Sequence, residues 1–169
     1  MFIISIIVLL ISTFIQGTAS NYIGYTYDNL SIFSTLYVLI SLMILNPFFE
    51  NKKKYFCLLV IFSLIIDIAY TNTPGLNTGL FLVIYYFSKA FHFFFPYNWF
   101  TISLSNLIAV TIYHTLTFLL LMILKYDTYT ISILLKILSH SILMTIIYSS
   151  TIYTILVLIV KKFELKEVK

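Results

Sequence analysis

Residues 61–78 have the sequence IFSLIIDIAYTNTPGLNT, in which a single carboxylate interrupts an apolar run. The run begins at Tyr55 and has the length and composition of a helix that crosses a membrane. The turn sequence Asn72-Thr73-Pro74-Gly75 ends this helix, and a second apolar run starts at Leu76. The stretch therefore predicts a helical hairpin with Asp67 close to its turn.

The composition of the whole chain agrees with a membrane protein. The chain has 169 residues, of which 61% are hydrophobic and only 9% are charged, whereas soluble domains are about 25% charged. This excludes most nucleic-acid binders, cytosolic enzymes and secreted modules. We expect an all-α integral membrane protein, a single polytopic domain over residues 1–169 that forms a six-transmembrane-helix bundle. The expected spans are about residues 2–16, 31–48, 55–71, 76–91, 101–124 and 131–160.

The first apolar run has a second interpretation. A signal peptide also has a short apolar core, and Thr18-Ala19-Ser20 loosely resembles its cleavage site. However, no Lys or Arg precedes the core at residues 2–16, and signal peptides begin with positive charge. We therefore expect this segment to be retained as the first helix.

The positions of the lysines predict the orientation. If the loops are numbered alternately, one side of the membrane holds Lys52, Lys53, Lys54, Lys89, Lys161, Lys162, Lys166 and Lys169. The other side holds Lys125, and Lys136 falls somewhat inside the last span. Cytoplasmic loops carry the Lys and Arg excess, so both termini are expected in the cytoplasm. The same lysines are expected to attract anionic membrane lipid rather than nucleic acid.

Polar residues within the spans are the candidates for a site. A charged carboxylate at mid-membrane costs about 2.5–3.5 kcal/mol, so Asp67 should face protein or water. Helical spacing places three sets on one face each: Ser63, Asp67, Tyr70 and Thr71; Ser103, Asn106, Val110, Tyr113, His114 and Thr117; and Lys136, Ser139, His140, Ser150, Thr151 and Thr154. Such residues usually hold membrane helices together. The alternative is that Asp67, His114, His140 and Lys136 converge as a ligand pocket or proton relay.

Catalytic motifs are absent from the sequence. It contains no Gly-x-Ser-x-Gly, His-Glu-x-x-His or Cys-x-x-Cys pattern, and its four glycines form no phosphate-binding loop. The single Cys57 excludes an internal disulfide and a cysteine-based metal cluster. We therefore expect a protein that is not an enzyme, with no catalytic residue, cofactor or metal site. Any ATP-driven or polymerising chemistry would belong to a partner.

The stretch at residues 61–78 resembles the rod shape-determining protein MreD family. That family has an apolar helix with a single Asp, a short turn, a Gly-Leu or similar pair (here Gly75-Leu76) and another apolar helix. The resemblance is best over about residues 54–124 and looser over the first two spans. Family members often have a Gly several residues before the Asp, where this chain has Phe62 and Ser63.

The resemblance implies a non-enzymatic scaffold of the cell-elongation (rod shape) machinery in the bacterial cytoplasmic membrane. Such proteins pair with the single-span shape protein MreC and act beside a glycan polymerase and its transpeptidase. They link cytoskeletal MreB filaments to peptidoglycan synthesis. Asp67, Pro74 and Gly75 would then fix the helical hairpin, and Asn106, His114 and His140 are further structural or interaction candidates.

A different class of protein is the alternative. Substrate-capture subunits of energy-coupling-factor vitamin transporters have a similar size, six helices and a similar fold. They require a small-residue patch of the Ala-x-x-x-Ala type on an early helix, and residues 2–16 contain no alanine. They also require an outward pocket, which Asp67, His114 and His140 could line.

Overall fold

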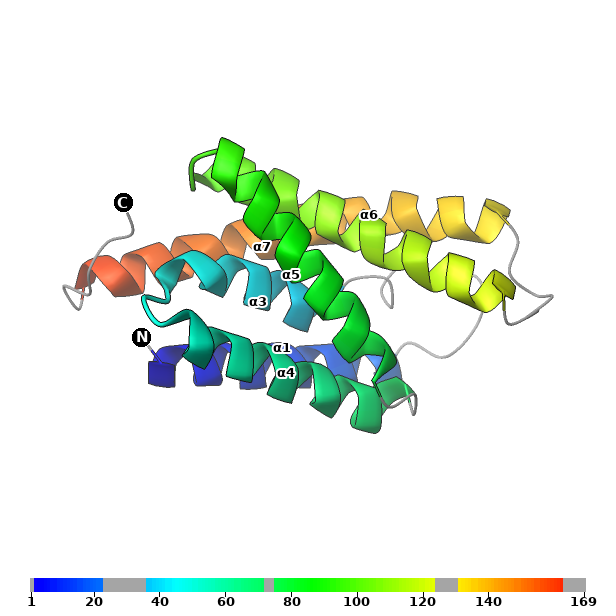
Figure 1. The fold of residues 1–169 in the computed structure, drawn as a ribbon, viewed down its shortest axis with the longest axis horizontal. Coiled ribbons are helices and arrows are strands. Elements are labelled where there is room, and N and C mark those ends of the chain that lie inside the picture. The colour runs from blue at the N-terminus through cyan, green and yellow to red at the C-terminus, as the bar shows by residue number, and fades with distance from the viewer. Residues whose placement is uncertain (1, 23–35, 72–74, 124–130, 163–169) are drawn as a thin grey trace.

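The computed structural model describes residues 2–22, 36–71, 75–123 and 131–162, in which all regular secondary structure is helical, as the sequence predicts. Figure 1 shows the arrangement of the long helices. In chain order the elements are α1 (Phe2–Tyr22), α3 (Tyr37–Leu45), the 3-10 turn η2 (Asn46–Phe48), α4 (Lys52–Ile66), the π-helical turn η3 (Asp67–Thr71), α5 (Leu76–Phe94), α6 (Trp99–Ile123) and α7 (Ile131–Lys162).

The core of the molecule is built around α3. Its sequence, YVLISLMIL, is apolar on every face except for one serine, and all nine residues are buried. A helix that is apolar all round must be surrounded by others, and α3 contacts α1, α5, α6 and α7. It ends where Pro47 enters the 3-10 turn. The most hydrophobic short helix is thus the centre of the packing.

The two longest helices, α6 and α7, form a hairpin with the most extensive contact between any two described helices. They have 25 and 32 residues and are long and apolar enough to cross a membrane. At 1.5 Å per residue, α7 extends about 48 Å, compared with about 30 Å for a bilayer's hydrocarbon core. Figure 1 shows this hairpin extending past α1, α4 and α5. Accordingly, no described α6 side chain after Tyr113 is buried.

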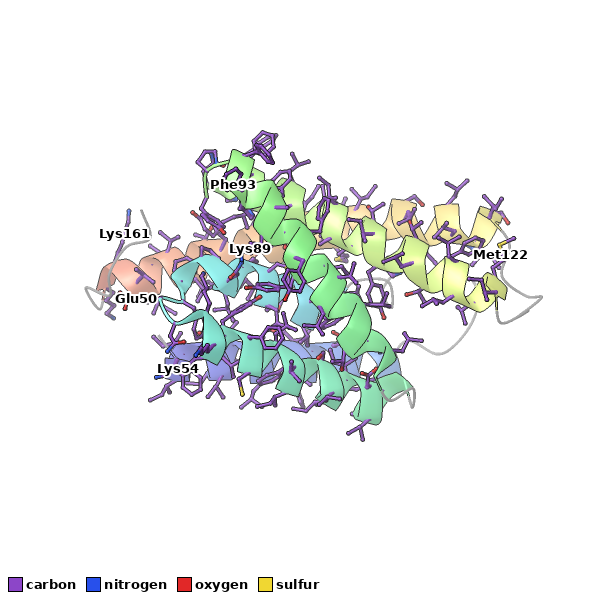
Figure 2. All side chains as sticks on the ribbon, viewed as in Figure 1. Glu50, Lys54, Lys89, Phe93, Met122 and Lys161 are labelled. Carbon is purple, nitrogen blue, oxygen red and sulfur yellow. The ribbon has the colours of Figure 1, made fainter. Side chains whose placement is uncertain are left out.

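Large apolar side chains also cover much of the outside. Ile3 on α1 is 73% exposed, Ile123 on α6 is 75% exposed and Leu158 on α7 is 61% exposed. Figure 2 shows such carbon-rich side chains projecting outward along the helices. Soluble monomers rarely expose contiguous apolar surface on this scale.

The helix boundaries differ from the expected spans, most clearly in the first half of the chain. The first helix continues to Tyr22. In the described part of the second span, helical structure begins at Tyr37 and ends at Phe48, and residues 31–35 lie outside the described part. Lys52–Lys54, expected in a loop, form the first turn of α4. The Asn51 side chain explains this, because its Oδ1 accepts from the backbone N–H of Lys53 at 3.0 Å and of Lys54 at 3.3 Å and so caps the helix.

Candidate functional site

The Asp67 carboxylate is fully buried and fastens two helices together. Its oxygens accept hydrogen bonds from the backbone N–H groups of Gly75 at 3.1 Å, Asn77 at 2.9 Å and Thr78 at 3.1 Å. They also accept from Asn77 Nδ2 at 3.0 Å and Thr78 Oγ1 at 2.8 Å. The first N–H groups of a helix have no partner within it and carry its positive dipole end. Asp67 therefore caps α5 from the end of the preceding helix, and the predicted internal position of this carboxylate is confirmed.

The backbone on each side of the turn is shaped for this contact. Asp67 begins the π-helical turn η3, where the helix widens after α4, and such turns are frequent at functional sites. Gly75, immediately before α5, has φ +91° and ψ −13°, in the left-handed region that glycine adopts without steric cost. Pro74 lies outside the described residues.

The network continues through Asn77 to a third helix. Its amide Oδ1 accepts a hydrogen bond from the Tyr113 hydroxyl of α6, and both residues are buried. Asp67, Asn77 and Tyr113 therefore join the end of α4, the start of α5 and the middle of α6. No motif in the sequence marks Asn77, although Asn77 and Thr78 are polar residues in the first turn after a Pro-Gly pair, where cap partners occur.

The other predicted candidates whose side chains are described lie outside this network or at its edge. Asn106 of α6 is 1% exposed, and its amide oxygen and nitrogen have no hydrogen-bond partner among the described residues. His114 follows Tyr113 on α6 and is half-buried, with its ring edge-on to that tyrosine at 5.4 Å. His140 belongs to α7, but its side chain lies outside the described part. Lys136 is exposed.

The predicted face of the third span is correct for two of its residues. Ser63 and Asp67 are buried, whereas Tyr70 is 37% exposed and reaches the first helix. The Tyr70 hydroxyl donates to the backbone carbonyl of Thr13 at 3.0 Å. A Cβ at Gly17 would overlap this hydroxyl, so glycine permits the close approach of α1 to the η3 turn.

The predicted polar face of the last helix is wrong for most of its residues, although Ser150 is half-buried and its hydroxyl is covered. Ser139, Thr151 and Thr154 of α7 are exposed. The two threonine hydroxyls donate to carbonyls of their own helix, each at 2.8 Å, which removes most of the cost of facing an apolar environment. The polar residues that are buried on α7 are Ser141, Thr145 and Ser149, at i, i+4 and i+8.

A second polar cluster, which the sequence reasoning did not identify, joins three other helices. The hydroxyls of Ser12, Ser41 and Tyr148 are mutually hydrogen-bonded, with Ser12 2.8 Å from each of the other two and Ser41 3.0 Å from Tyr148. The ring of Tyr37 packs edge-on against Tyr148 at 4.8 Å. This hydroxyl cluster ties α1, α3 and α7 together in the core.

Both clusters are built to hold helices in place. In each, side chains distant in sequence complete one another's hydrogen bonds in the interior, where an unmet donor would be costly. Comparison of the chain with protein-family models, with curated proteins and with solved structures finds no match.

Proposed function

We propose that this protein is a six-span membrane scaffold of the bacterial cell-elongation machinery and is not an enzyme. The observation that carries the proposal is the hairpin fastened by Asp67, which occupies the stretch that resembles the MreD family. The carboxylate is buried and accepts hydrogen bonds from the backbone at the start of the next helix. The aspartate that carries the family resemblance therefore has a structural role.

Placement in the cytoplasmic membrane is supported by exposure and charge. Large apolar side chains are exposed on the long helices, and α6 and α7 are long enough to span. Figure 2 shows Lys54 and Lys161 near one end of the molecule and Met122 at the other. The lysines that begin α4 and end α7 therefore gather on one side, as the positive-inside rule requires of a cytoplasmic face. In this topology both termini are cytoplasmic.

The proposed mechanism is mechanical. A single-span MreC-type partner would pack against exposed helix faces, because membrane helices associate through van der Waals contact and interhelical hydrogen bonds. The partner's position then depends on the angle between α4 and α5. The Asp67 cap fixes that angle at the turn, which holds the partner in register with the glycan polymerase and transpeptidase that act beside it.

The test is recovery of the tagged chain from its own cells in a gentle detergent, with identification of the proteins that co-purify. We expect a single-span coiled-coil shape protein together with a glycan polymerase and a transpeptidase. Asp67→Leu should reduce this recovery while the variant still inserts into the membrane. The control is Ser63→Ala, which changes a buried residue one turn earlier whose hydroxyl bonds only its own helix at Val60 among the described contacts.

Two results would contradict the proposal in different ways. Normal partner recovery and normal cell shape with Asp67→Leu would remove the role given to the hairpin. Recovery of a large membrane coupling subunit with two ATPases would instead identify a substrate-capture subunit of a vitamin transporter.

A further inference from the structure

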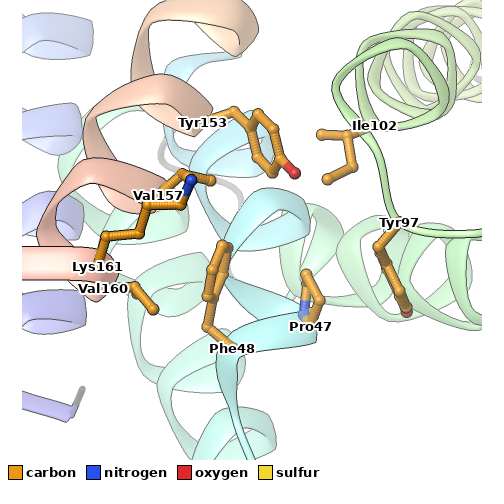
Figure 3. Close-up of a pocket in the computed structure, with 8 residues that line it drawn as sticks. All are labelled: Pro47, Phe48, Tyr97, Ile102, Tyr153, Val157, Val160 and Lys161. Carbon is orange, nitrogen blue, oxygen red and sulfur yellow. The ribbon is translucent and has the colours of Figure 1, made fainter. Parts of the chain in front are cut away.

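A cavity of about 260 Å³ lies where the chain's basic end meets its apolar body. Its walls come from η2, the connector before α6, the start of α6 and the last three turns of α7 (Figure 3). Phe48, Ile102, Val157 and Val160 give the cavity apolar walls, and Tyr153 and Lys161 add polar groups. This volume is slightly below the range of about 300–1,000 Å³ for drug-sized ligands. It suits a headgroup and the first carbons of a chain rather than a whole lipid.

The surroundings of the cavity are positively charged. Lys52 donates from Nζ to the backbone oxygen of Asn46 at 2.8 Å, which brings a second ammonium group beside the Pro47 wall. Burial lowers the pKa of Lys52, and the positive charge of Lys89 lowers it further. Among the described residues the acidic side chain near this end is Glu50 (Figure 2). The basic charge in this region is therefore in excess.

One tyrosine hydroxyl at the cavity can donate a hydrogen bond. Figure 3 shows the Tyr97 hydroxyl pointing away from the other lining residues, so Tyr97 contributes its ring to the wall and not a donor. Figure 3 shows the Tyr153 ring projecting from α7 toward Ile102, with its hydroxyl at the tip. An ammonium group and a phenol donor beside an apolar wall suit a molecule with an anionic head and an apolar tail.

We propose that this cavity binds the phosphate headgroup of an anionic membrane lipid, with Lys161 as its counter-ion and Val157 and Ile102 against the start of the acyl chain. The inference rests on the membrane placement given under the proposed function but not on the role in cell elongation. A lipid fits better than free phosphate, because a free ion gains nothing from apolar walls. In the proposed topology the lysine-bearing end lies at the cytoplasmic leaflet, where anionic lipids are concentrated.

The experiment measures binding of short-chain lipids to the full-length chain, purified in an uncharged detergent, by native mass spectrometry. The probes are dioctanoyl phosphatidylglycerol, dioctanoyl phosphatidylcholine and inorganic phosphate. We expect one saturable site for the phosphatidylglycerol, at least tenfold weaker binding of the phosphatidylcholine and no binding of inorganic phosphate. Binding of inorganic phosphate as tight as that of the phosphatidylglycerol would overturn the assignment to a lipid.

Two adjacent lysines give a matched comparison, because Lys161 lines the cavity and Lys162 does not. A lysine near an anionic surface contributes about 1 kcal/mol, so Lys162→Gln should weaken binding about fivefold at most. Lys161→Gln should weaken it tenfold or more, because a charge-assisted hydrogen bond is also lost. Equal effects of the two substitutions would overturn the cavity as the site and leave only general attraction to basic charge.

A third variant tests the apolar wall. Val157→Phe should fill the cavity and weaken phosphatidylglycerol binding tenfold with the charges unchanged, and unchanged binding would contradict the proposal. Failure of the proposed function would be recognised separately. A native chain found in the soluble fraction without detergent would contradict the membrane placement. Failure to recover a shape protein with the chain would contradict the proposed function and leave the lipid result intact.

Discussion

Gly75 and Gly79 lie four residues apart, but only Gly75 has a backbone conformation that favours glycine. Gly75 has φ +91°, and an L-residue there costs about 1–2 kcal/mol. Gly79 lies within α5 and has open space around its Cβ position. We expect Gly75→Ala to lower the unfolding free energy by about 1 kcal/mol and Gly79→Ala to raise it by about 0.5–1 kcal/mol. Thermal unfolding in detergent, followed by the fluorescence of the single Trp99, measures both, and a stabilising Gly75→Ala would contradict the assigned turn.

The Asp67 cap predicts a graded series of losses. Asp67→Leu leaves three backbone N–H groups of the α5 turn without their acceptor, and we expect a loss of about 2 kcal/mol or more. Asp67→Asn keeps one acceptor oxygen and should lose about half as much. Ser63→Ala, used as the control, should change stability by less than about 0.5 kcal/mol. Chemical unfolding in detergent would show the order, and equal losses for Leu and Asn would mean that the oxygens do not act as caps.

At this scale the sequence predicts the main residue of the site but not its partners. The cost of a carboxylate inside an apolar helix is enough to place Asp67 in the interior. Its contact with Asn77 depends on the π-helical turn and on the path of the chain through Gly75, which no periodicity specifies. The same limit applies to Asn106, whose burial is predicted by the face it shares with Ser103 but whose lack of a partner is not.

Between elements, the hydroxyl cluster of Ser12, Ser41 and Tyr148 should couple the three helices it joins. Tyr148→Phe removes the hydroxyl that bonds both serines. Such bonds contribute about 0.6 kcal/mol each in membrane proteins, so we expect a loss of about 1 kcal/mol. A double-mutant cycle with Ser41→Ala should show coupling between the two sites. Tyr86→Phe, at an exposed tyrosine, is the control and should have no effect. Strictly additive losses would show that the cluster does not join α3 to α7.

Element type is predictable from this sequence, whereas the inward face of an element is only partly so. The uniform hydrophobicity of residues 37–45 is compatible with a lipid-facing span, but the helix is short and surrounded by others. On α7 the polar residues divide between the two faces. The hydroxyls of Thr151 and Ser149 both bond their own helix, yet Thr151 is exposed and Ser149 is buried near Ser103. Polarity alone therefore does not identify the packed side of a membrane helix.

For the whole molecule, the gathering of lysines at one end predicts a topology that reporters can test. The start of α4 and the end of α7 carry five of the described lysines, Lys52–Lys54, Lys161 and Lys162, so both should lie in the cytoplasm. A reporter fused after Lys169 or inserted after Asn51 should then read as cytoplasmic. A reporter inserted after Tyr126 should read as external, because α6 and α7 each cross once in the proposed topology. Insertion after Thr73 should give the same external reading, since the Asp67 hairpin turns on that side.

If the reporters at Lys169 and Tyr126 read the same side, α7 does not cross the membrane, and the proposed lipid site at Lys161 would lose its place at the cytoplasmic leaflet.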